Sequence, residues 1–243
     1  MKILSIGNSF SQDAHKWLHS LASSGNRCID TYNLYIGGCT LEKHWDCIEN
    51  NLCVYDKEGN GGEKICKSSV LQALEDDKYD VITLQQASGF SGKPQSYIPY
   101  LIKIADYVKE YQPDAKLLFH QTWSYEVDST HQHFEFYNKD QKEMYRRICD
   151  SAMMASKLIS AEIIPVGDVI QKLRENSEEF DYPNGGLSLC RDGFHLSLLY
   201  GRFAAAAVWY KVLTGEKADV KAFAEQNPEF DASLFEIILK YIY

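Results

Sequence analysis

Three residues at opposite ends of the chain carry side chains that could act together in nucleophilic catalysis. Asp192 and His195 are three residues apart across Gly193, so one tight turn can hold both side chains. The carboxylate can then bond one imidazole nitrogen and leave the other free to accept a proton, as in a Ser-His-Asp triad. The segment Gly7-Asn8-Ser9-Phe10-Ser11 supplies Ser9 as the candidate nucleophile. If both ends of the chain meet in space, these residues predict a serine hydrolase.

The elements that must position these residues follow from an alternation of short apolar runs with helical patterns. The apolar runs predict strands at 2–6, 29–36, 80–85, 115–119 and 161–164, with 29–36 a candidate edge strand. Helical patterns cover 11–23, 97–111, about 133–159, 198–213 and 230–242. Apolar strands that alternate with helices are typical of a parallel sheet covered on both faces. We expect an α/β fold in a single domain, 1–243.

The segment from 50 to 67 interrupts this alternation. Asn50-Asn51 and the glycine-rich stretch 59–62 flank two short runs that contain β-forming residues. Such a pattern predicts a small hairpin insertion, hinged by glycines, at the surface.

Polar residues follow the first three predicted strands. Ligands of open α/β sheets bind beyond the carboxyl ends of the strands, where the strand order reverses. In the common order 2-1-3-4-5, Ser9, Gly37-Gly38 and Gln85-Gln86 would meet there. The backbone N–H groups of Ser9 and Gly38 could bind an oxyanion, and the side chain of Gln86 could add a third donor.

Aromatic residues follow the fourth predicted strand. The rings of Trp123 and Tyr125 could stack on a sugar, or could pack beneath the loop. His131 and His133, in a polar and aromatic segment, are secondary candidates for substrate contact.

Each candidate also has a purely structural interpretation. Ser9 or Ser11 could be the N-cap of the first helix, and Gly37-Gly38 could simply turn the chain. Asp192 could cap a helix that begins near Ser197, with His195 at the surface. The functional interpretation is favoured because all of these residues fall at the predicted ligand-binding edge.

Composition and charge exclude several classes of partner. The 243 residues are 45% hydrophobic and carry a net charge of −9, which disfavours binding to nucleic acid. No apolar run approaches the roughly 20 residues that span a bilayer, so no membrane partner is expected. The chain opens directly on a predicted strand rather than a signal peptide, so we expect it in the cytoplasm, or exported if a leader was removed.

The cysteines are expected to be free thiols. There are seven, an odd number, and no CxxC pair occurs. A zinc site is conceivable where five potential ligands cluster, but their spacing matches no standard finger, and we expect no metal: Cys39, His44, Cys47, Cys53 and Cys66.

These motifs resemble the SGNH (GDSL-like) hydrolase superfamily, and more closely a poorly characterised bacterial branch with a GNSFS start. Gly7-Asn8-Ser9-Phe10-Ser11 matches its first block, with Asn8 where GDSL members have Asp. Gly37-Gly38-Cys39-Thr40 matches the second block and implies Gly38 as the oxyanion glycine. The fifth block, DxxH, is Asp192-Gly193-Phe194-His195. The resemblance covers nearly the whole chain.

The third block departs from the family. Where GxND is expected, the chain has Leu84-Gln85-Gln86-Ala87-Ser88-Gly89, so the oxyanion asparagine is missing. Gln86 or Ser88 could replace it. The resemblance implies a flavodoxin-like three-layer α/β/α sandwich with a five-stranded parallel sheet, no cofactor, and esterase activity, often on acetylated carbohydrates.

Two functions follow as hypotheses. The leading one is a serine carboxylester hydrolase that removes an O-acetyl group from a carbohydrate. The alternative is a catalytically weak carbohydrate-binding protein on the same fold. A flavin or nucleotide binder is disfavoured because the first loop lacks a phosphate-cradling glycine-rich run. An α/β-hydrolase is disfavoured because Ser11 stands where G-x-S-x-G requires its second glycine.

Overall fold

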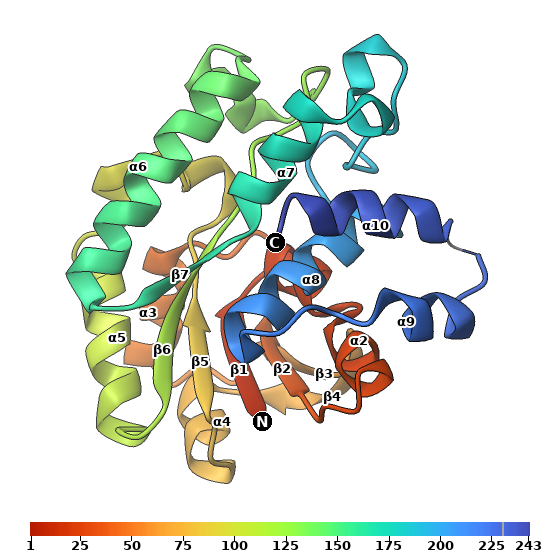
Figure 1. Ribbon diagram of the computed structural model, residues 1–243. Helices are drawn as coiled ribbons and strands as arrows, with labels where there is room; N and C mark the ends of the chain where they lie inside the picture. Colours follow the sequence, from red (N-terminus) through yellow and green to blue (C-terminus); the bar gives the residue numbers. More distant parts are fainter. Residues whose placement is uncertain (230) are drawn as a thin grey trace.

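The chain is organised around one seven-stranded sheet, seen in a computed structural model that describes residues 1–229 and 231–243 (Figure 1). The strands are β1 Lys2–Gly7, β2 Asp30–Tyr35, β3 Tyr55–Gly59, β4 Glu63–Ser68, β5 Val81–Leu84, β6 Lys116–Gln121 and β7 Glu162–Pro165. The α-helices are α1 Ser9–His15, α2 Leu18–Ser24, α3 Leu41–Glu49, α4 Val70–Asp76, α5 Tyr100–Tyr111, α6 Gln141–Ile159, α7 Val166–Asn176, α8 Tyr200–Thr214, α9 Val220–Gln226 and α10 Ala232–Lys240. Short 3-10 helices are η1 Ser88–Phe90, η2 Pro94–Ser96, η3 Gln132–Tyr137, η4 Glu178–Phe180 and η5 Tyr182–Asn184.

Five parallel strands form the part of the sheet that the sequence predicts. They lie in the order β2-β1-β5-β6-β7, and every neighbouring pair is parallel. Without the hairpin strands this is the order 2-1-3-4-5, so the predicted three-layer α/β/α topology is confirmed. The three central strands, β1, β5 and β6, are short and almost wholly buried because helices cover both faces of the sheet.

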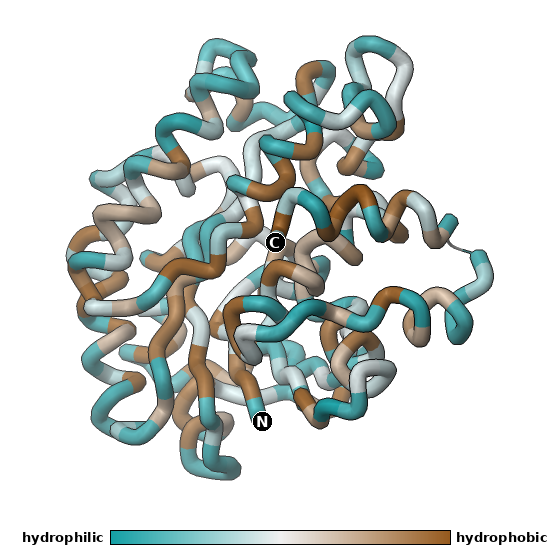
Figure 2. The backbone as a smooth tube through the Cα atoms, viewed as in Figure 1, coloured by the Kyte–Doolittle hydropathy of each residue, from teal (hydrophilic) through white to brown (hydrophobic). Residues whose placement is uncertain are grey.

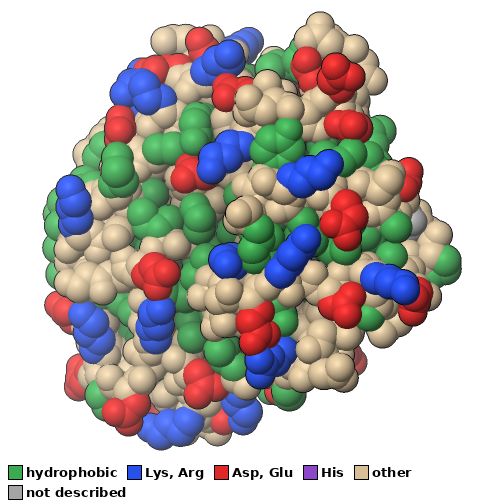
Figure 3. Space-filling view, viewed as in Figure 1, with side chains coloured by type: hydrophobic (Ala, Val, Ile, Leu, Met, Phe, Trp, Pro, Cys, Tyr) green, Lys and Arg blue, Asp and Glu red, His purple; other side chains and the backbone are tan. Residues whose placement is uncertain are grey.

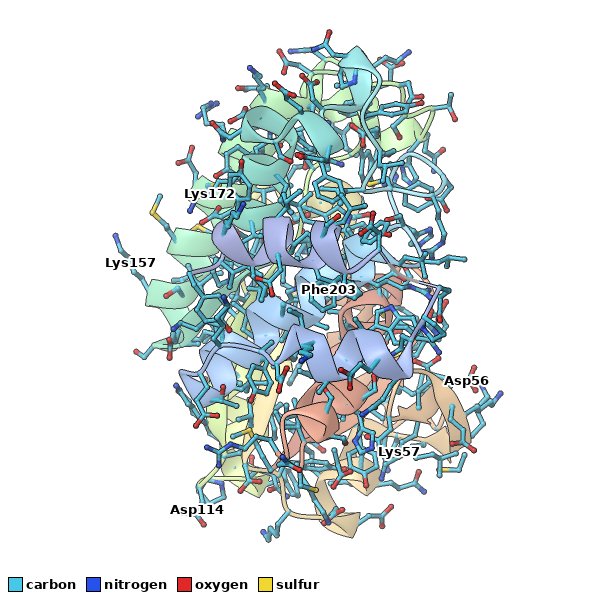
Figure 4. The ribbon with its side chains drawn as sticks, turned by 45° about the vertical axis from the view of Figure 1, so that its right-hand side comes forward. Asp56, Lys57, Asp114, Lys157, Lys172 and Phe203 are labelled. Atoms are coloured by element: carbon cyan, nitrogen blue, oxygen red, sulfur yellow. The ribbon has the colours of Figure 1, made fainter. Side chains whose placement is uncertain are left out.

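The prediction of a five-stranded sheet is wrong because the predicted hairpin joins it. β3 pairs with β2 and β4 pairs with β3, both antiparallel, so β2 is not an edge strand. An unpaired strand edge leaves backbone N–H and C=O groups without hydrogen-bond partners, and the hairpin supplies these partners to β2. On the outer strands, Lys64 and Lys67 each form an ion pair with Asp56, which is labelled in Figure 4.

Side chains of the strands enter two hydrophobic cores, because successive residues of a strand point to opposite faces. On β1, Ile3 lies in one core and Leu4 in the other. The first core contains α1, α2, α7, α8, α9 and α10, and the second contains α3, α4, α5 and the C-terminal half of α6. Figure 2 shows hydrophobic stretches along the central strands, where these two cores meet the sheet.

Three helical regions differ from the sequence-based prediction. The helix expected over 11–23 is two helices, α1 and α2, separated at Lys16-Trp17. The C-terminal region packs as three helices, with α9 and α10 beside α8. Phe203 of α8 contacts Phe235 of α10 at 4.0 Å and Phe223 of α9 at 5.5 Å between ring centroids (Figure 4). The helix expected over about 133–159 is η3 followed by α6, which begins at Gln141. Helices α3, α4, α7 and α9 are not among the predicted elements.

Three histidines are buried in this fold as neutral side chains. His15, His44 and His120 are at most 2% exposed, and burial lowers the pKa of each to about 3. The ordinary pKa of histidine is about 6.5, so the unfolded chain binds more protons than the folded chain between about pH 3 and 6.5. The free energy of unfolding is therefore fully retained above about pH 6.5 and falls as the pH is lowered through this window.

We expect the protein to be acid-labile for this reason. Each histidine can contribute a slope of up to about 1.4 kcal/mol per pH unit, or about 4 kcal/mol for the three together. Urea unfolding at pH 7.5, 6.0 and 5.0 measures the slope. His44→Leu should reduce the slope of the free energy of unfolding against pH by about a third, whatever that substitution does to stability at pH 7.5. A free energy of unfolding that stays constant down to pH 5.0 would contradict the prediction.

Within residues 1–229 and 231–243, no helix combines the length and the apolar character needed to cross a bilayer. On the face shown in Figure 3, acidic and basic side chains are interspersed among neutral ones.

Candidate active site

The structure brings Ser9, His195 and Asp192 together at the carboxyl edge of the sheet. Ser9 is the first residue of α1 and is separated from the end of β1 by Asn8 alone. Its Oγ lies 2.9 Å from Nε2 of His195, and Nδ1 of His195 lies 2.7 Å from Oδ2 of Asp192. A hydroxyl, an imidazole and a carboxylate are thus joined in series, which is the geometry that proton transfer from the hydroxyl requires.

The turn that carries the acid and the histidine is held by its own backbone. Oδ1 of Asp192 accepts hydrogen bonds from the N–H groups of His195, at 2.8 Å, and Phe194, at 3.3 Å. Gly193 has a φ of +83°, and a Cβ there would lie 3.0 Å from Cα of Ser129, so glycine is required. Burial raises the pKa of the Asp192 carboxyl, but hydrogen bonds from His195 outweigh this and hold the pKa below its usual value.

Asp13 ties this turn to the helix that carries Ser9. It lies one helical turn after Ser9 on α1, and its side chain is fully buried. Its carboxylate pairs with Arg191 at 3.0 Å and with Arg202 at 2.7 Å, and accepts the Leu196 N–H at 2.9 Å. Residues on both sides of the Asp192–His195 turn are therefore fixed to α1 through one buried carboxylate.

Asn8 links the Ser9 helix to the loop after β2. Its Oδ1 accepts from the Phe10 N–H at 3.0 Å, which makes Asn8 the N-cap of α1. The same oxygen accepts from Gln85 Nε2 at 2.8 Å, and Nδ2 of Asn8 donates to the Cys39 carbonyl at 3.1 Å. Since Gln85 in turn contacts His120 Nδ1 at 2.7 Å, a buried polar network lies beneath the site.

Comparison with known proteins identifies the family of this chain. Residues 2–232 match the family described as "Domain of unknown function (DUF4886)". The chain belongs to this family. A crystal structure of a DUF4886 family protein from Bacteroides uniformis ATCC 8492 is 37% identical, with a TM-score of 0.81, over 89% of this chain and 83% of that chain. No curated protein matches the chain.

Two more distant structures share the fold of this DUF4886 protein. A candidate SGNH hydrolase from Slackia heliotrinireducens is 18% identical, with a TM-score of 0.61, over 88% of this chain and 98% of that chain. Axe2, an acetylxylan esterase from Geobacillus stearothermophilus, is 11% identical, with a TM-score of 0.50, over 95% of each chain. The resemblance to the SGNH superfamily is thus confirmed at the level of the fold.

The structure settles which residues cap the helices near the site of this DUF4886 protein. Because Asn8 is the N-cap of α1, the interpretation of Ser9 as the cap is wrong; Ser11 instead accepts the Asn8 N–H at 3.0 Å in a capping box. Asp192 does not cap the next helix either, since α8 begins at Tyr200 without a side-chain cap.

Gly38 and Gln86 both follow the ends of their strands, as the sequence predicts, but the side chain of Gln86 does not point into the site. Gly38 is exposed after β2 with a φ of +63°, and a Cβ there would meet nothing within 4 Å. The side chain of Gln86 is 1% exposed and is used in loop packing. Its Nε2 donates to Ser96 at 3.0 Å, and its Oε1 accepts from the N–H groups of Leu41 and Ala87 at 3.0 and 2.8 Å.

The prediction that the Gln86 amide points between Ser9 and Gly38 is therefore wrong. The extra methylene lets the amide reach backbone groups of two neighbouring loops, and buried backbone groups need such partners. The other candidate, Ser88, is half-buried, and its Oγ lies 2.9 Å from the hydroxyl of Tyr125.

Trp123 and Tyr125 are buried beneath the site rather than exposed in it. Both are 0% exposed, so neither ring offers a face to a sugar, and this prediction is wrong. Trp123 stacks on Phe10 with 4.1 Å between centroids, and its Nε1 donates to the Phe194 carbonyl at 2.7 Å. The two side chains instead support the α1 helix and the Asp192–His195 turn from below.

The candidate zinc ligands do not converge. Cys39, His44 and Cys47 are buried, with His44 Nδ1 3.0 Å from the Tyr55 hydroxyl, whereas Cys53 and Cys66 are exposed. No group of three or more potential metal ligands occurs in the part of the chain that the structure describes. All seven cysteines are free thiols.

Sequence reasoning missed the supporting residues Asp13 and Asn8. The signal for Asp13 was a carboxylate between Phe10 and Ala14 on the apolar side of the first helix. A charge at such a position requires a buried partner, although the sequence does not show which arginine supplies it.

Asn8→Asp should test the link between the Ser9 helix and the Gly38 loop. The new carboxylate oxygen would face the Cys39 carbonyl, which now accepts from Nδ2, and the repulsion should move the loop away from Ser9. We expect kcat with p-nitrophenyl acetate to fall about tenfold or more, and the free energy of unfolding to fall by about 1–3 kcal/mol. Asn176→Asp, which adds the same charge at an exposed position on α7, is the control and should change neither value. Unchanged kinetics in Asn8→Asp would contradict the proposed link.

Proposed function

We propose that this chain is a serine esterase that removes a small acyl group, most specifically an O-acetyl group, from a carbohydrate. The observation that carries the proposal is the series of two short contacts from Ser9 Oγ to His195 and from His195 to Asp192. Residues 186 positions apart in the sequence form the first of these contacts. Neither contact is needed to cap a helix, because Asn8 caps α1 and α8 has no side-chain cap.

The proposed reaction has two halves. Ser9 Oγ attacks the ester carbonyl carbon while His195 Nε2 takes the hydroxyl proton, and Asp192 holds the imidazole in the required tautomer. The tetrahedral intermediate then collapses, the C–O bond to the sugar breaks, and His195 gives its proton to the leaving alcohol. In the second half His195 activates a water that attacks the acyl-enzyme, which releases the carboxylic acid and restores Ser9.

The oxyanion of each intermediate would be bound by the backbone N–H groups of Ser9 and Gly38. These residues follow β1 and β2, which pair in parallel up to Gly7 and Tyr35, so both loops leave the sheet side by side. Asn8, through its bond to the Cys39 carbonyl, would hold the Gly38 loop at a fixed distance from Ser9. Preorganised donors of this kind act mainly on the transition state.

Carbohydrate O-acetyl esters are proposed for two reasons. The structural neighbour Axe2 is described as an acetylxylan esterase, and it shares the fold over nearly the whole chain. The base is also accessible, since the side chains of His195 and Asp192 are 20% and 42% exposed, which suits an ester carried on a large, solvated molecule.

A second candidate function is a carbohydrate-binding protein with weak catalysis. The observation that favours it is the use of Gln86 in loop packing, which leaves the third strand without the superfamily's asparagine donor. One oxyanion donor is typically worth about 3–4 kcal/mol, so two remaining donors could support only slow turnover.

Two assays separate these functions. An esterase should hydrolyse p-nitrophenyl acetate with multiple turnovers and should be labelled at Ser9 by a fluorophosphonate probe, as located by peptide mass spectrometry. Release of acetate from a panel of acetylated glycans then defines the sugar. If p-nitrophenyl acetate is not turned over and the probe does not label Ser9, the esterase proposal is wrong.

A further inference from the structure

A row of partly exposed rings begins at the candidate base. The ring of Phe194 lies 4.1 Å from that of His195 and 4.7 Å from that of His131, measured between centroids. His131 lies 5.1 Å from His133. Phe194, His131 and His133 are all half-buried, so each contacts both the protein and solvent.

The row continues away from the base onto η1 and η3. His133 stacks on Phe136 with 5.0 Å between centroids and 11° between planes, and Phe90 meets His133 edge-on at 5.1 Å. Phe136 is 37% exposed, and the ammonium of Lys93 lies 3.1 Å from the centroid of its ring. We call Phe90, His131, His133, Phe136 and Phe194 the ring shelf.

The ring shelf is held firmly from below. The buried hydroxyl of Tyr137 accepts the Gly92 N–H and donates to the Gly89 carbonyl, both at 3.0 Å, and so joins η3 to the loop after β5. Gly89 packs directly under His133, because a Cβ there would lie 2.2 Å from Nδ1 of that ring. His131 Nδ1 accepts the His133 N–H at 3.1 Å and fixes the start of η3. The rings are therefore arranged before any ligand arrives.

The composition of the ring shelf distinguishes between possible ligands. Burial and neighbouring cationic groups lower the pKa of His131 and of His133, so both imidazoles are neutral at pH 7. Because Nδ1 of His131 already accepts the His133 N–H, that ring offers a ligand its Nε2–H as a donor. An alkyl chain laid on these rings would cover polar nitrogens without bonding them, which is costly. A sugar has apolar C–H groups for the exposed parts of the phenylalanine rings and hydroxyls for the imidazoles and Lys93, so it matches both kinds of group.

We propose that the ring shelf binds the sugar residues of an oligosaccharide whose ester-bearing unit lies at Ser9. The proposal rests on the proposed esterase function and extends it from a single acylated sugar to a chain. Phe194 contacts His131, His131 contacts His133, and His133 contacts Phe136, so the ring shelf has a near end at the base and a far end at Phe136. A monosaccharide at Ser9 would cover the near end and leave the far end bare.

The kinetic test compares chain lengths. Chemically acetylated gluco-, xylo-, manno- and galacto-oligosaccharides of one to six units are assayed beside p-nitrophenyl acetate. In at least one series kcat/KM should rise tenfold or more with length. Phe136→Ala should lower the ratio of kcat/KM for the hexamer to kcat/KM for p-nitrophenyl acetate about tenfold. Leu158→Ala is the matched control, because Leu158 is also 37% exposed but lies at the end of α6 that leads into β7. It should leave that ratio unchanged.

Binding is measured separately in the Ser9→Ala variant, by calorimetric titration with the unacetylated oligosaccharides. Binding that tightens with chain length and is lost in Ser9→Ala/Phe136→Ala supports the ring shelf even if no ester is cleaved, and only the esterase proposal would then fail. The inference is overturned if acetate is released with no effect of length in any series. A preference for long acyl chains would also overturn it. In that case kcat/KM would be higher for p-nitrophenyl octanoate than for p-nitrophenyl acetate, and Phe136→Ala would remove the difference, because the ring shelf would then bind an acyl chain.

Discussion

Ser9→Ala should lower esterase activity by three orders of magnitude or more while the fold is retained. The substitution removes the atom that would attack the ester, and the hydroxyl has no part in capping α1, which Asn8 performs. We therefore expect the free energy of unfolding to change by less than about 1 kcal/mol. kcat with p-nitrophenyl acetate and urea unfolding of the same preparation measure the two effects independently.

The same loss is expected for His195→Ala, and the double variant should be barely slower than either single variant. Residues that act as one unit in catalysis are strongly non-additive, because removing one disables the others. Ser197→Ala, close in sequence to His195 but outside the contacts to Ser9 and Asp192, is the control for an altered serine in this segment. Full activity in Ser9→Ala would show that another nucleophile carries the reaction.

Asp13→Asn should be the most destabilising single substitution near the site. Its carboxylate is 0% exposed and is shared by Arg191, Arg202 and the Leu196 N–H. Breaking a buried ion pair from one side typically costs about 3–5 kcal/mol. We expect a value near the lower end, because the side chains of Arg191 and Arg202 are 28% and 15% exposed and water can partly compensate their charges. In a chain of this size that corresponds to a fall in Tm of about 10 °C, measured by circular dichroism.

Asp13 should also affect the rate at which Ser9 reacts, because it holds the Asp192–His195 turn against α1. At a temperature where Asp13→Asn is still folded, the rate of fluorophosphonate labelling per folded molecule should fall about tenfold or more. Asp168→Asn is the matched control: this carboxylate contacts Gln121 and Tyr145 and none of the turn. It should lower Tm without changing the labelling rate. Normal labelling in folded Asp13→Asn would make Asp13 a purely structural residue.

Much of the fold could be predicted because its signals are local. Short buried strands that alternate with amphipathic helices identify a parallel sheet, since only a sheet covered on both faces needs strands that are apolar on both sides. The hairpin at 50–67 was also visible from its glycines. Its attachment to β2 was not, because strand pairing depends on which edge is left uncovered in space, and nothing in the hairpin's own residues states that.

Part of the candidate site could likewise be predicted from local sequence, and part of it could not. By itself the sequence determined that Ser9, Gly38, Asp192 and His195 stand at strand ends or in one tight turn, because those positions depend on residues a few places away. Only the tertiary structure decided that Gln86 bonds Leu41 and Ser96 and that Trp123 packs under Phe10. Glutamine and tryptophan are long enough to reach several neighbours, so their partners are set by whichever backbone groups and apolar surfaces the folded chain leaves unsatisfied. The sequence lists such side chains but does not contain the distances that choose among their partners.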